Sequence, residues 1–71
     1  MLKLGVDKLV RLAAAGGGFE VDAGRMHLMD IVKIVAASKP NARIVVKNAE
    51  GLHIDDLVRI SAASEGSAFF E

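Results

Sequence analysis

The sequence predicts a small α/β domain in which three helix–strand units lie side by side. The sheet is expected to be parallel and three-stranded, in the order 1-2-3, with all helices on one face. Three observations predict this class: one pattern occurs three times, each copy has the hydrophobic spacing of a helix, and a short strand-like segment follows each copy. We expect one domain over residues 1–71, with repeats at about 4–25, 26–51 and 52–71.

The repeated pattern is clearest in His27–Ser38 and His53–Ser64, which correspond closely in residue type, and Gly5–Ala15 is a third copy. With the central leucine or isoleucine of each copy as anchor, the copies lie 22 and 26 residues apart; the anchors are Leu9, Ile31 and Leu57. This period falls within the roughly 20–29 residues of repeats that contain one strand and one short helix.

Each copy has the pattern of an amphipathic helix. In the second copy, apolar residues fall at i, i+3, i+4 and i+7; they are Leu28, Ile31, Val32 and Val35. The helices are expected to begin after Gly5, His27 and His53 as N-cap residues, with aspartates in the first turn that favour the helix dipole. They are expected to end at the glycine run 16–18, at Lys39-Pro40-Asn41 and at Glu65-Gly66.

Strand-like segments follow these stops at residues 19–22, 43–47 and 68–71. Strands joined by a helix must run parallel, so the three form one parallel sheet. Their alternation directs one set of side chains away from the helices: Glu20, Asp22, Arg43, Val45, Lys47 and one of Phe69 and Phe70. Glu20 or Asp22 is expected to pair with Lys47 or Arg43. In the turns that follow, Gly24 and Gly51 align, and we expect both to adopt positive φ.

Composition excludes several classes of function. Nine basic and nine acidic residues cancel, and there is no Trp or Tyr, so neither electrostatic nor stacking contacts to nucleic acid are expected. No apolar run approaches the ~20 residues of a membrane span. The absence of cysteine fits a reducing compartment, and we expect a cytoplasmic location. We expect no cofactor.

Self-association is the main functional expectation. The chain is short and 52% hydrophobic, and helices on one face leave the other face of a parallel sheet bare. The third strand also has an open edge. We therefore expect a homodimer or higher oligomer with Val45, Phe69 and Phe70 at the contact, and other protein domains are further candidate partners. The function expected is protein interaction or self-assembly without catalysis.

The competing hypothesis is a small anion or metal site. His27 and His53 occupy equivalent positions at helix N-termini after parallel strands, where anions and ligands tend to bind, and Arg25 lies close by in sequence. The simpler alternative is that each histidine caps its helix. No Ser-His-Asp set, G-x-S-x-G elbow or phosphate-binding loop is present, so we expect no enzyme.

From Leu4 to Glu71, the copies resemble αβ-solenoid repeats of the leucine-rich-repeat kind, in architecture and period rather than in a sequence signature. From Phe19 onward the chain also resembles the strand–helix core of STAS-type regulatory domains. The phosphorylatable serine of that family has no counterpart, because Met26-His27-Leu28 occupies its place, so regulation by phosphorylation is not implied.

Overall fold

A computed structural model describes residues 4–71 of the chain and contains three helices, a 3-10 turn and three strands. In chain order these are α1 (Val6–Ala14), β1 (Phe19–Asp22), α2 (Leu28–Ala37), β2 (Ile44–Lys47), η1 (Ala49–Gly51), α3 (Ile54–Ser64) and β3 (Ala68–Phe70). The three predicted strands agree with the observed ones to within a residue at each end. Gly5, His27 and His53 are the N-cap residues, as expected.

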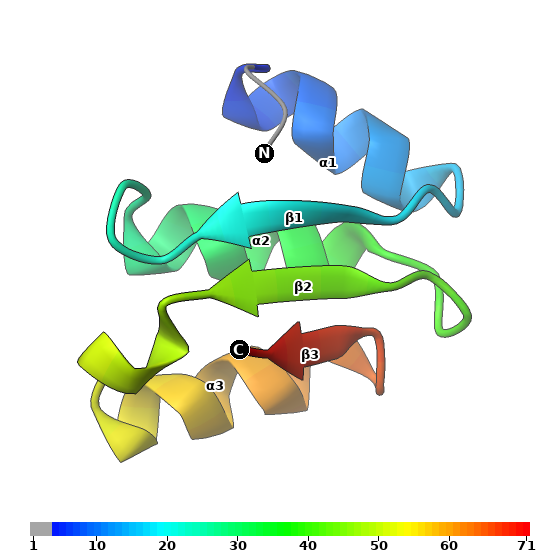
Figure 1. Cartoon of the computed structure of the whole chain (residues 1–71). Coiled ribbons are helices and arrows are strands. Elements are labelled where there is room, and N and C mark those ends of the chain that lie inside the picture. The colour runs from blue at the N-terminus through cyan, green and yellow to red at the C-terminus, as the bar shows by residue number, and fades with distance from the viewer. Residues whose placement is uncertain (1–3) are drawn as a thin grey trace.

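The strands form one parallel sheet in the order β1-β2-β3. Ile44 lies between Phe19 and Ala68, and Val46 lies between Val21 and Phe70. Figure 1 shows the three arrows pointing the same way, with α2 behind the sheet and α1 and α3 on either side of it. The predicted fold class, a three-stranded 1-2-3 sheet in a mixed α/β domain, is confirmed.

The hydrophobic core lies between the sheet and the helices, and α2 contributes most of its helical part. Ile31, Ile34 and Val35 of this central helix are fully buried, because α2 has a neighbouring helix on each side. The outer helices each bury fewer side chains: Leu9 and Ala13 in α1, and Ile60 and Ser64 in α3. Burying a large aliphatic side chain completely stabilises a fold by about 1.5–3 kcal/mol.

The glycine run after α1 has two separate roles. Gly16 has φ +94°, and its N–H donates to the carbonyl of Ala13, while the Gly17 N–H donates to Leu12 at 2.9 Å. These two bonds form a Schellman motif, which closes the helix. Gly18 lies so close to β2 that a Cβ built on it would stand 2.8 Å from the carbonyl oxygen of Arg43. The run therefore ends the helix, as predicted, and also brings β1 against β2.

The ends of α2 and α3 meet at a cluster of buried serines. The Ser38 hydroxyl donates to the Val35 carbonyl at 2.6 Å and contacts the hydroxyl of Ser67, which in turn donates to Ser64 at 2.8 Å. Every buried side-chain polar atom in residues 4–71 has such a partner. Beyond α3, Glu65 turns the chain in the left-handed region with φ 52°, followed by Gly66 at φ 94°.

One expectation about the strand-to-helix turns is wrong. Neither Gly24 nor Gly51 has a positive φ, and in this part of the chain that conformation belongs to Asn48, at φ 60°. Asparagine adopts the left-handed region more readily than most residues, and here its side-chain amide donates to the Asp22 carboxylate of the other turn. A Cβ on Gly24 would stand 3.2 Å from the Asp22 carboxylate, whereas Gly51 has open space around it. A side chain at position 24 would therefore crowd the Asp22 carboxylate, whereas the backbone conformation does not require glycine.

Among the helices of residues 4–71, none has the length and apolarity needed to cross a membrane.

Candidate functional site

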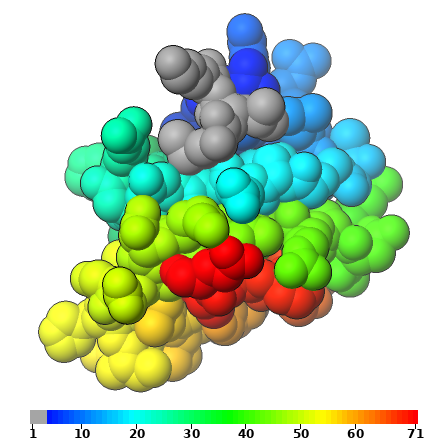
Figure 2. Space-filling model, viewed as in Figure 1, coloured from blue at the N-terminus to red at the C-terminus, as the bar shows by residue number. Residues whose placement is uncertain are grey.

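The face of the sheet opposite the helices combines Val45 at its centre and Phe69 beside it with charged side chains. Glu20, Val45 and Phe69 lie in one row across the three strands, with Lys47 of β2 in the next row. Figure 2 shows β2 and β3 side by side on this face. Val45 was expected to be exposed here, but only 7% of its surface is accessible. It therefore offers little area to a partner.

Phe69 provides most of the exposed apolar surface on this face. It is 41% accessible, and the guanidinium carbon of Arg43 lies 4.5 Å from the centre of its ring. A cation over an aromatic face at this distance is attracted by the ring quadrupole. On the open face, one side of the Phe69 ring is therefore covered by a cation.

Phe70 lies on the opposite side of β3, in register with the buried Val46. Its position is therefore on the core side of the sheet, yet 37% of it is exposed. The reason is topological: β3 is an edge strand, and no further strand in residues 4–71 lies beyond it. The free edge presents unpaired backbone groups next to an incompletely covered ring.

The charge pair on the open face differs from the expected one. Lys47 bonds to Glu71 at 2.8 Å, rather than to Glu20 or Asp22 of the neighbouring strand. This hydrogen bond is the main cause that raises the pKa of Lys47 and lowers the pKa of Glu71 from their ordinary values. The charge of Glu20 makes only a smaller contribution to the raised Lys47 pKa. The pair connects the end of β2 to the residue after β3.

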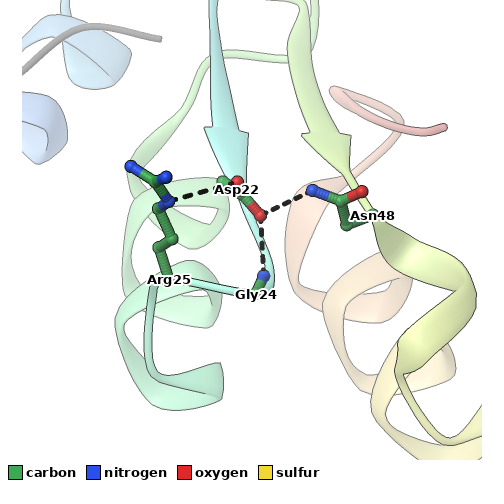
Figure 3. A network of polar contacts seen from close by, with 4 residues as sticks. All are labelled: Asp22, Gly24, Arg25 and Asn48. Carbon is green, nitrogen blue, oxygen red and sulfur yellow. Dashed lines mark hydrogen bonds and ion pairs between the residues drawn. The ribbon is translucent and has the colours of Figure 1, made fainter.

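At the carboxyl ends of β1 and β2, four residues form a polar network around Asp22 (Figure 3). One Asp22 oxygen accepts hydrogen bonds from the Gly24 N–H and the Asn48 side-chain amide, each at 2.8 Å. The other oxygen is 3.9 Å from the Nε atom of Arg25. The bond from Asn48, followed by that from Gly24, lowers the pKa of Asp22. This network ties the two strand-to-helix turns together.

Of the three predicted ligand-binding residues, only Arg25 takes part in this network, and its side chain is largely exposed. His27 and His53 are also exposed; they stand at the N-caps of α2 and α3, but neither imidazole makes a capping hydrogen bond. The two histidines therefore occupy the predicted N-cap positions, but their side chains do not make the capping hydrogen bond that this interpretation implies. Within residues 4–71, no group of three His, Cys, Asp or Glu side chains could hold a metal ion.

Two surface features were not identified from the sequence. A shallow groove along the outer side of α1 is lined by Leu4, Lys8, Arg11 and Leu12. At the other end of the molecule, Ile54 and Val58 of α3 are exposed. The available signal was the spacing of four residues between Lys8 and Leu12 and between Ile54 and Val58, because residues four apart share one side of a helix.

In comparisons with known proteins, no family model matches this chain, and no curated protein or solved structure matches it significantly.

Proposed function

We propose that this chain is a non-enzymatic protein-interaction module that self-assembles through the open edge of its sheet. The observation that supports this most directly is the unpaired edge of β3, next to the exposed rings of Phe69 and Phe70. Edge strands of this kind readily pair with another chain, and natural monomers usually protect them with charge, proline or a covering element. The sequence of β3 is Ala-Phe-Phe, which contains none of these charges or prolines.

The size of the domain supports the same proposal. Small domains bury a limited fraction of their surface, so association with a partner commonly supplies part of their stability. Several large apolar side chains stay exposed in the single chain, among them Phe69 and Phe70. Covering them in a contact would remove apolar area from water, at roughly 25 cal/mol per Å².

The test is the concentration dependence of size, measured by sedimentation velocity on the wild type and on Phe70→Glu. We expect the wild type to associate at micromolar concentrations and Phe70→Glu to sediment as a folded monomer. Met29→Glu is the matched control, because Met29 is an exposed apolar residue of α2 that lies away from β3. A wild type that stays monomeric at several hundred micromolar, or a Phe70→Glu variant that associates as the wild type does, overturns the proposal.

The alternative, an anion or metal site around His27 and His53, is favoured by one observation: both imidazoles are exposed and make no capping bond. It predicts that a His27→Ala/His53→Ala variant loses binding of phosphate or Zn²⁺ while its stability changes by less than about 1 kcal/mol. Calorimetric titration of wild type and variant decides this. Equal heats for the two proteins would exclude the histidine site.

A further inference from the structure

The exposed apolar residues of α3 have partly buried counterparts in the other two helices. When the three copies are aligned on their anchors, Val58 corresponds to Val32 and Val10, both of which pack against the core. Val58 itself is 59% exposed. The neighbouring Ile54, which corresponds to Leu28 and Val6, is 66% exposed. In α1 and α2 these positions belong to residues that pack against the core; in α3, at the end of the row of helices, they are left uncovered.

On the outer side of α1, an exposed residue likewise has buried counterparts in the other two helices, but here the exposed copy belongs to the first helix. Leu12 corresponds to Ile34 of α2 and Ile60 of α3, which are both completely buried. Leu12 is 39% exposed and lines the groove on α1. This position is covered where another helix precedes in the row, and α1 is the first helix of the row (Figure 1). The outer sides of α1 and α3 are therefore the two unmatched halves of one contact that the chain makes twice internally, α1 against α2 and α2 against α3.

The sheet has the same two unmatched halves. Within residues 4–71, β1 has a strand on one side only, and so does β3. Because all strands are parallel, the free edge of β3 in one copy could pair with the free edge of β1 in another copy. In the same register, Phe70 would lie beside Val21 of the next copy, just as Val46 lies beside Val21 within one chain. The exposed ring of Phe70 would then be covered.

The charges along the contact allow one specific ion pair. The α1 groove carries two cations, Lys8 and Arg11, between its two leucines. The exposed side of α3 carries the carboxylate of Asp55 next to Ile54 and the guanidinium of Arg59 next to Val58. Asp55 is therefore the residue of this ridge that can attract the cations of the groove.

We propose that copies of this chain join head to tail: α3 and β3 of one copy pack against α1 and β1 of the next, which continues the internal arrangement across the boundary. This inference rests on the proposed function and specifies its partner surface. The contact is heterologous, since it uses two different surfaces, so successive copies form either a closed ring or an open filament rather than a two-fold dimer.

The test uses two variants, each blocked at one half of the contact. Leu12→Glu places a charge in the α1 groove, and Val58→Glu places one on the α3 ridge; both side chains are substantially exposed in the single chain, so both variants should fold. Each variant alone should weaken assembly by at least about tenfold. An equimolar mixture should form a dimer of one copy of each variant, because the mixture retains one intact α1 surface and one intact α3 surface.

Sedimentation velocity on the wild type, each variant and the mixture gives distinct outcomes, with Met29→Glu as the control and circular dichroism to verify folding. A mixture that stays monomeric, or variants that assemble as the wild type does, overturns the head-to-tail contact while leaving self-assembly itself intact. A monomeric wild type overturns both proposals. If Leu12→Glu unfolds, Lys8→Glu tests the same groove, and it should weaken assembly more in low salt than in high salt; an unchanged assembly there also overturns the contact.

Discussion

Replacing Gly18 by alanine tests how β1 is held against β2. A Cβ at this position would stand 2.8 Å from the Arg43 carbonyl oxygen and 3.4 Å from the Arg43 nitrogen. The first distance is well inside the roughly 3.5 Å at which non-bonded heavy atoms attract each other. The obstruction is backbone, which cannot rotate away as a flexible side chain could. The two strands must therefore separate locally.

The magnitude follows from two contributions. Forcing an extra methyl group into a packed position costs about 1–3 kcal/mol. The separation also weakens the hydrogen bond from the Phe19 N–H to the Arg43 carbonyl, 3.0 Å long, which is worth about 1 kcal/mol. We expect a net loss of about 2–3 kcal/mol. At about 4–8 °C per kcal/mol for a domain of this size, the melting temperature should fall by about 10–20 °C.

The assay is thermal and urea unfolding followed by circular dichroism at one fixed protein concentration, because self-association would otherwise alter the apparent stability. Gly51→Ala is the matched control: its added Cβ meets nothing within 4 Å and its φ is not positive. That variant should be neutral or stabilised by up to about 1 kcal/mol. One hydrogen bond contributes about 0.5–1.5 kcal/mol to stability. If the free energies of unfolding of Gly18→Ala and the wild type differ by less than about 0.5 kcal/mol, the lower end of that range, the steric argument fails.

Two further predictions concern the turns. Glu65→Gly should raise the free energy of unfolding by about 1 kcal/mol in urea titration, because it relieves a left-handed residue at φ 52°, whereas Glu65→Ala should not. Asn48→Gly keeps the backbone conformation but removes the hydrogen bond to Asp22, so the pKa of Asp22 measured by NMR titration should rise towards its ordinary value. Since the folded-state pKa of Asp22 is lowered, its contribution to stability is present above its unfolded-state pKa and is lost as pH falls through the folded value. Asn48→Gly should therefore show a weaker loss of stability on acidification, and an identical acid profile would contradict this assignment.

Local sequence determined much of the fold because the relevant signals are short-range. The spacing of Leu28, Ile31, Val32 and Val35 determines which side of the helix is apolar. In the first strand, side chains alternate between the two faces of the sheet, so Val21 points inward and Glu20 outward. Three copies of the same signals, joined by helical crossovers, leave the parallel 1-2-3 order as the simplest arrangement. These features were predicted from the sequence alone.

Only the tertiary structure decided which apolar residues stay exposed, since exposure depends on neighbours that are distant in the chain. Val10, Val32 and Val58 are alike in sequence, yet Val58 is exposed because α3 has a helix on one side only. Val45 was expected on a bare face and is buried among neighbouring strands, and Asn48 rather than a glycine took the left-handed turn because Asp22 accepts its amide. Periodicity along a chain specifies the direction of a side chain, but the position of its unit at the middle or the end of the row specifies what covers it.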